Sequence, residues 1–134
     1  VTNEARALLL LEQEGIIKLK DDAGIKATAA DIVENPKNIT FQEIAPEQLV
    51  RALPDVDIAV INGNYAIEGG LHVKDALAVE SDQGIAAQTY ANIIAVRSED
   101  KDNEAVKKLV EVLKSDEIKQ FITDKYEGAV VPID

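Results

Sequence analysis

The segment over residues 56–61, VDIAVI, constrains the fold of this chain more than any other. It is rich in β-branched residues and almost continuously apolar, which is the pattern of a strand buried on both faces of a parallel sheet. Apolar runs predict further strands over residues 39–44, 75–79 and 92–97. Parallel neighbours are joined by long crossover connections, usually helices. A chain of this kind therefore needs helices between its strands.

The predicted helices occur where this arrangement requires them. Ser115 is a residue type that caps the start of a helix, so it predicts a helix that begins at residue 116. The residue before Pro36 avoids helical geometry, so it predicts the end of the preceding helix. The predicted helices cover residues 3–14, 28–34, 46–52, a short stretch from Tyr65, 103–114 and 116–126. Strands that alternate with helices indicate an α/β fold with a mostly parallel sheet.

The opening helix, residues 3–14, has an unusual apolar surface. Leu8, Leu9, Leu10 and Leu11 are consecutive, so apolar side chains point in nearly every direction around the axis. Such a helix is expected to be buried on more than one face. A helix of this type normally follows a strand, so we expect the sequence to begin in the middle of a fold.

The charge of the chain limits its partners. Its 25 acidic and 14 basic residues give a net charge of −11, which repels nucleic acid and anionic membrane surfaces. The absence of cysteine excludes a disulfide framework and a thiolate metal site. No apolar run approaches the ~18 residues that span a bilayer, and no signal peptide is evident at the start of the sequence.

Asn3 and Arg6 are the first candidate binding residues. They lie one turn apart on the opening helix, so they share a face. A guanidinium can hold a carboxylate through two parallel hydrogen bonds, and a helix N-terminus adds free backbone N–H groups. Both side chains therefore suit a bound carboxylate. The alternative is an arginine paired with a nearby glutamate and an asparagine that only caps the helix.

A second candidate position follows the strand at residues 56–61. Asn62 and Asn64 come directly after it, and ligands of open α/β sheets bind at the carboxyl ends of the strands. An asparagine amide both donates and accepts hydrogen bonds, which suits a zwitterion. The alternative is turn chemistry, because Asn-Gly sequences tolerate left-handed backbone conformations.

The sequence offers little for catalysis. His72 is the only histidine, so a metal site or a histidine-based triad is not expected. Asp55 and Asp57 would point to opposite faces of a strand, and the remaining acidic clusters lack calcium-loop spacing. We predict no catalytic residue, no metal and no cofactor.

Three stretches carry a resemblance to a known family. TNEARALLLLEQEGIIKLKDDAG, DIVENPKNITFQEI and DIAVINGNYA, followed by TYANIIAVRSEDKDNEAVKKLVEVLKSDEIKQFI, resemble the methionine-binding lipoproteins of ABC importers, the NlpA family. This resemblance implies a fragment of a type II periplasmic-binding-protein fold. Residues 1–82 would belong to the second lobe, and residues 83–134 would form the crossover and the return to the first lobe.

The resemblance also implies a site and partners. Asn3 and Arg6 match the family's N-x-x-R motif, which would hold the α-carboxylate of the ligand. Asn62 would contact the backbone groups of the amino acid, and Tyr65 matches a tyrosine nearby. The ligand would be L-methionine or a related amino acid, delivered to an ABC permease without chemical change.

The departures from the family pattern are informative. The family's first lobe and its lipidated cysteine, which anchors the precursor to the membrane, would both precede residue 1. Gly63 and Asn64 replace residues that are more often threonine, which leaves the ligand's identity open. A chain with half of the cleft would bind weakly or not at all, and its unpaired apolar edges would favour self-association.

Two other classes of protein remain open from the residues alone. A small α/β enzyme would show turnover that is lost in His72→Ala. A ligand-free interaction domain would show Arg6 fully exposed and paired with Glu4.

Overall fold

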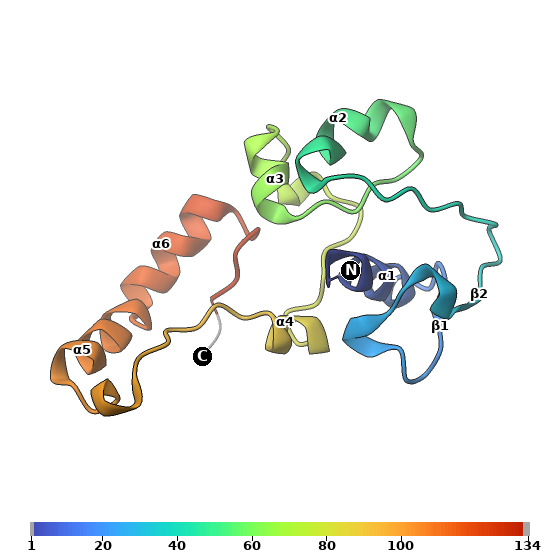
Figure 1. Ribbon diagram of the computed structural model, residues 1–134. Helices are drawn as coiled ribbons and strands as arrows, with labels where there is room; N and C mark the ends of the chain where they lie inside the picture. The colour runs from blue at the N-terminus through green and yellow to red at the C-terminus, as the bar shows by residue number, and fades with distance from the viewer. Residues whose placement is uncertain (1, 133–134) are drawn as a thin grey trace.

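The computed structural model describes residues 2–132 (Figure 1). Its α-helices and strands follow the order α1 (Thr2–Gln13), β1 (Lys18–Leu19), β2 (Ile32–Glu34), α2 (Leu49–Ala52), α3 (Gly63–Glu68), α4 (Ile85–Thr89), α5 (Glu104–Leu113) and α6 (Asp116–Tyr126). Short 3-10 turns connect them at Gly24–Lys26, Ala29–Asp31, Pro46–Gln48, Leu53–Asp55, Val73–Asp75 and Ser98–Asp100.

Helix α1 organises the hydrophobic core. It is built mostly of Ala, Leu, Glu and Gln, which are strong helix formers, and Gly15 follows it with a positive φ of 66°. The core consists of the buried side chains of Ala5, Leu8, Leu11, Ile17, Leu19 and Ala27. Leu9 and Leu10 are half-buried on other sides of the helix. The expected burial of α1 on more than one face is therefore observed.

Strands β1 and β2 form an antiparallel pair, with Lys18 opposite Glu34 and Leu19 opposite Ile32. The connection between them is held by Asp31. Its carboxylate accepts hydrogen bonds from the Thr28 backbone N–H at 2.9 Å and the Thr28 hydroxyl at 2.8 Å, and from Lys20 Nζ at 3.1 Å. These donors stabilise the charged form and lower the pKa of Asp31.

The prediction of a helix over residues 28–34 is wrong. Only Ala29–Asp31 turn, as a single 3-10 turn, and Ile32–Glu34 form strand β2. Asp31 bonds back to Thr28 and so closes one turn, while the β-branched Ile32 and Val33 suit a strand. Ile32–Glu34 pair with strand β1, and this pairing is incompatible with a helix over the same residues.

The predicted parallel sheet is absent from residues 2–132. Residues 39–44, 56–61 and 92–97 have no regular structure, and the 75–79 stretch begins at the end of a 3-10 turn. The two-stranded pair β1–β2 is the only sheet in the described part of the chain. A strand persists only where a neighbour pairs its backbone N–H and C=O groups. Within these residues the four apolar segments find no such neighbour.

The remaining helix predictions are confirmed. Residues 46–52 form a 3-10 turn that continues into α2, and α3 begins two residues before Tyr65. Helices α5 and α6 match their predicted ranges closely. The side chain of Asn103 accepts a hydrogen bond from the Ala105 N–H at 2.9 Å, and Ser115 caps α6 by accepting from the Ile118 N–H.

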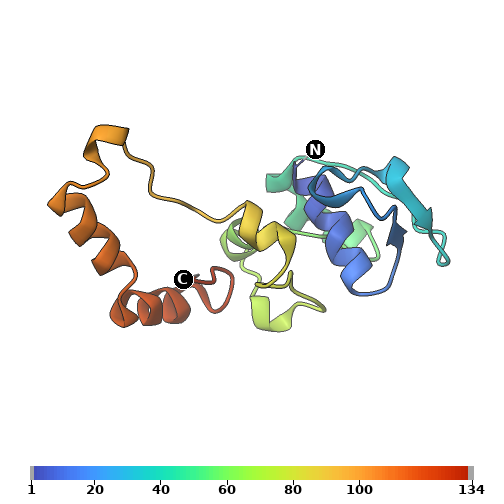
Figure 2. The same cartoon turned by 90° about the horizontal axis from the view of Figure 1, so that it is seen from below.

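Helix α5 lies apart from the body that contains α1 to α4, whereas the C-terminal end of α6 reaches α3, where Tyr126 and Ile67 line the same hollow (Figures 1 and 2). The segment after α4 joins the two parts. The chain after α6 returns toward α3, where the Ala129 carbonyl oxygen lies so close to Gly63 that a Cβ there would be 3.1 Å away. Several large apolar side chains are exposed, with Leu77 at 94% and Ile93 at 83%.

Candidate ligand-binding site

Arg6 is held by a carboxylate from a distant part of the sequence. Its Nε donates to Glu80 Oε1 at 3.1 Å, and its Nη2 donates to Glu80 Oε2 at 2.6 Å. The two side chains are 33% and 29% exposed. The pair is therefore bidentate and mostly shielded from solvent, the geometry in which an Arg–carboxylate pair is strongest and most directional.

Tyr90 covers the guanidinium of Arg6. The ring centroid lies 5.5 Å from Cζ of Arg6, within the range of a cation–π contact. The hydrogen bond with Glu80 is the main cause that raises the pKa of Arg6, and it outweighs the opposing effect of burial. Glu80 and Tyr90 thus fix the orientation of the Arg6 guanidinium, and the hydrogen bond with Glu80 favours its charged form.

Gln13 fixes the backbone on both sides of Glu80. Its Nε2 donates to the Val79 carbonyl oxygen at 3.2 Å, and its Oε1 accepts from the Ser81 N–H at 3.1 Å. Gln13 lies seven residues after Arg6, which places both on one face of α1. Gln13 on α1 therefore holds the backbone of residues 79–81 through two hydrogen bonds, one to the residue before Glu80 and one to the residue after it.

A hollow of about 240 Å³ adjoins this cluster. Its apolar lining includes Leu9 and Leu10 from α1 and Ile85 and Ala86 from α4, and Glu80 is one of its polar lining residues. The combination of an apolar surface and a few directed polar groups is typical of small-molecule sites.

Arg6 keeps unused hydrogen-bond donors. A guanidinium has five N–H groups, of which one on Nε and one on Nη2 are given to Glu80. The N–H groups of Nη1 meet no acceptor between residues 2 and 132. Because Nη1 and Nη2 form a second edge of the planar group, that edge matches a second carboxylate.

The structure does not join all four predicted site residues. Asn3 is exposed on the first turn of α1. Asn62 is half-buried at the start of α3 and its side chain makes no capping hydrogen bond; Tyr65 is half-buried in the same helix. Within residues 2–132 no hydrogen bond links Asn3, Asn62 or Tyr65 to Arg6. Their roles stay predictions.

Sequence reasoning missed Glu80, Gln13 and Tyr90. Glu80 is 74 residues from Arg6, and no local pattern connects residues so far apart. One signal was present: Glu80 is the acidic residue that ends the apolar stretch LAVE. A carboxylate directly after a predicted strand was therefore a possible ion-pair partner for Arg6.

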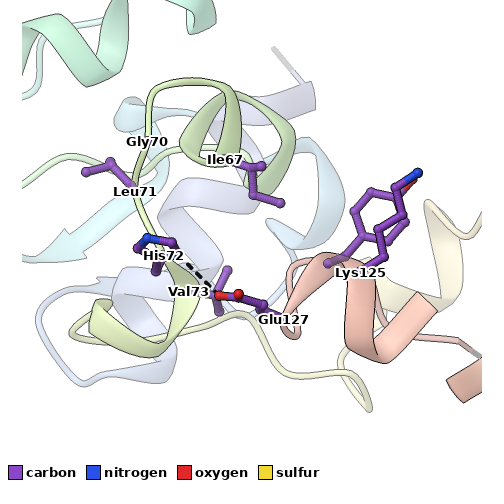
Figure 3. A pocket seen from close by; sticks show the side chains of 8 residues that line it. Ile67, Gly70, Leu71, His72, Val73, Lys125 and Glu127 are labelled. Atoms are coloured by element: carbon purple, nitrogen blue, oxygen red, sulfur yellow. Dashed lines mark hydrogen bonds and ion pairs between the residues drawn. The ribbon is translucent and has the colours of Figure 1, made fainter. Parts of the chain in front are cut away.

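His72 belongs to a separate, smaller hollow of about 120 Å³. Figure 3 shows His72 and Glu127 pointing toward each other, and His72 Nδ1 lies 3.2 Å from Glu127 Oε2. The other lining residues are Ile67, Gly70, Leu71, Val73, Lys125 and Tyr126. Both members of this pair are exposed. Among the described residues, no cluster of three or more His, Cys, Asp or Glu side chains is arranged to hold a metal ion.

Solved structures share this fold and define its class. A putative lipoprotein from Ruminococcus gnavus is 50% identical and superposes with a TM-score of 0.83, over 99% of this chain and 55% of that one. A nutrient-binding protein from Burkholderia cenocepacia bound to methionine is also 50% identical, with a TM-score of 0.77 over 96% of this chain and 54% of that one. The fold is that of part of a substrate-binding lipoprotein, which confirms the predicted class.

The family follows from the sequence. Residues 1–134 match the profile of the NlpA lipoprotein family, and this chain belongs to that family. The methionine-binding lipoprotein of Bacillus subtilis is 44% identical over 137 residues, which cover 99% of this chain and 49% of the relative. A probable D-methionine-binding lipoprotein of Pasteurella multocida is 42% identical over 131 residues, 97% of this chain and 46% of the relative.

The chain thus spans about half the length of the relatives it matches. Between residues 2 and 132, no helix has the length and apolar character required to cross a membrane.

Proposed function

We propose that this chain is part of an extracytoplasmic solute-binding component of an ABC importer. In this proposal it binds an amino acid, with L-methionine as the first candidate, and contributes to the delivery of that amino acid to the membrane permease. It binds without catalysis. In this proposal a lipid on the N-terminus of the precursor holds the protein at the membrane surface; the name of the family, NlpA lipoprotein, supports a lipid-bearing protein.

The observation that carries the proposal is the state of Arg6. The guanidinium is mostly shielded and is fixed by Glu80 and Tyr90, and Glu80 also lines a partly apolar hollow. One edge of it remains for a carboxylate. A relative that is 50% identical is described as bound to methionine, a ligand with a carboxylate and an apolar side chain.

Arg6 is paired with a glutamate, as the alternative to ligand binding expected, but the arrangement given for a ligand-free interaction domain is not observed. That reading required Arg6 to be fully exposed and paired with Glu4. Instead Arg6 pairs with Glu80, and Glu4 accepts a hydrogen bond from the Ala29 N–H at 3.1 Å.

The other predicted residues complete the proposed site. Asn3 supports Arg6 at the α-carboxylate, Asn62 contacts the backbone groups of the amino acid, and Tyr65 lies nearby. Residues 1–82 supply the second-lobe part of the site, and residues 83–134 form the crossover and the return to the first lobe. Closure of the two lobes would signal occupancy to the permease, because a ligand shifts an equilibrium only toward the state it binds better.

The function is tested by replacing the matching segment of the Bacillus subtilis methionine-binding lipoprotein with this chain. We expect this hybrid to bind L-methionine saturably in titration calorimetry. The 134-residue chain by itself should bind at least about tenfold more weakly, because fewer groups then surround the ligand. A hybrid that melts cooperatively but does not bind L-methionine would overturn the proposal.

We also propose that the chain by itself self-associates. The large apolar side chains that it exposes include Ile58, Leu77, Ile93, Ile94, Leu109, Val112 and Phe121. Exposed apolar patches and unpaired extended segments favour contacts between copies. Sedimentation velocity should show dimers or larger species whose population rises with concentration. A single monomeric species at every concentration would contradict this expectation.

A further inference from the structure

The Arg6–Glu80 pair raises a problem of charge for any bound carboxylate. Glu80 already balances the charge of Arg6, and the two groups are mostly shielded from water. A second carboxylate at Arg6 adds an uncompensated negative charge within a few ångströms of Glu80. Such like-charge contacts are costly at low effective dielectric constant.

An amino acid resolves this problem with its own ammonium group. The two oxygens of Glu80 each accept one hydrogen bond from Arg6, and a carboxylate oxygen can accept a second. Glu80 therefore has acceptor capacity for an ammonium while it still holds Arg6. Arg6, Glu80 and a bound zwitterion then have no net charge, and each of the four charged groups lies next to a group of opposite charge.

We propose that Arg6 and Glu80 together form a zwitterion-recognition pair. Arg6 binds the α-carboxylate through its Nη1 and Nη2 edge, and Glu80 binds the α-ammonium. This inference rests on the proposed function and deepens it, because it makes Glu80 the residue that selects amino acids over simple carboxylic acids.

The surroundings of Glu80 fit this role. Gln13 bonds to the backbone on both sides of Glu80, at the Val79 carbonyl oxygen and the Ser81 N–H, and Arg6 bonds to both oxygens of the Glu80 carboxylate. The hollow beside Glu80 is lined by Leu9, Leu10 and Ile85. An amino acid with its ammonium on Glu80 can direct an apolar side chain into that hollow.

The test uses the hybrid, with two ligands: L-methionine and its analogue in which hydrogen replaces the α-amino group. The unsubstituted hybrid should bind L-methionine at least about tenfold more tightly than the analogue. In Glu80→Gln the affinity for L-methionine should fall about tenfold to 100-fold. The affinity for the analogue should stay constant or rise, because the repulsion of its carboxylate is removed. Glu47→Gln, at an exposed position, is the control and should change neither affinity.

Two results would overturn the inference. If Glu80→Gln weakens both ligands by the same factor, Glu80 only positions Arg6. If it strengthens both equally, Glu80 is a competitor for Arg6. If the unsubstituted hybrid binds neither ligand, the proposed function itself fails, and that failure is visible before any variant is made.

A second measurement needs no ligand and uses the chain by itself. The Nε–H of Arg6 should give a slowly exchanging proton signal in nuclear magnetic resonance spectra, because it is hydrogen-bonded to Glu80. The exchange rate should rise in Glu80→Gln, whose amide is a weaker acceptor than a carboxylate. Fast exchange in the unsubstituted chain would show that the pair is not held, and the inference would fail.

Discussion

Arg6→Ala should lower the affinity of the hybrid for L-methionine about 100-fold. The change removes the group that we propose to hold the α-carboxylate and leaves Glu80, which is mostly shielded, without its partner. Loss of one member of a hydrogen-bonded charge pair in an interface costs about 2–5 kcal/mol. Since Arg6 is one-third exposed, we expect the lower half of that range, about 3 kcal/mol, which corresponds to about 100-fold.

Two further variants sharpen this measurement. Arg6→Lys keeps the charge but loses the planar edge, so its affinity should lie between those of the parent and Arg6→Ala. Arg51→Ala removes an exposed arginine on α2 and should bind as the parent does. Titration calorimetry measures all three. An affinity in Arg6→Ala equal to that of the parent would remove Arg6 from the site.

Leu8→Ala should destabilise the chain by about 2–4 kcal/mol. Leu8 lies on α1 at the centre of the core and is 2% exposed. Truncation to alanine removes apolar burial and leaves a cavity that the surrounding side chains fill only in part. Few residues between 2 and 132 are buried, so the loss falls on a small core and should shift the denaturation midpoint strongly.

The matched control is Leu77→Ala. The same substitution at a side chain that is 94% exposed, measured at a concentration at which the chain is monomeric, should change the free energy of unfolding by no more than about 0.5 kcal/mol. Urea denaturation followed by circular dichroism gives both values. Equal effects of the two substitutions would show that α1 does not carry the core.

Local signals in the sequence predicted the helices well. The starts of α5 and α6 depend on Asn103 and Ser115, whose side chains bond to N–H groups two or three residues away. Helix hydrogen bonds and caps connect near neighbours, so a short window of sequence contains most of what decides them. The 28–34 prediction failed where a strand partner at Lys18–Leu19 competed with the local preference.

Strands and the candidate site depend on contacts between residues that are distant in sequence, so the sequence predicted them less well than the helices. Residues 56–61 have the composition of a buried strand, yet a strand requires a neighbour that composition does not supply. Arg6 was proposed as a site residue from its place on α1 and from the family resemblance, and its role stays a prediction. Glu80 was missed because the chain must fold before its carboxylate meets Arg6.

A crystal structure of the hybrid with L-methionine tests the central claim most directly. We predict density for the ligand with its carboxylate about 2.7–2.9 Å from Nη1 and Nη2 of Arg6, with its ammonium at Glu80 and with Asn62 in contact with its backbone groups. Methionine bound elsewhere, with the Nη1 edge of Arg6 still unoccupied, would contradict the account.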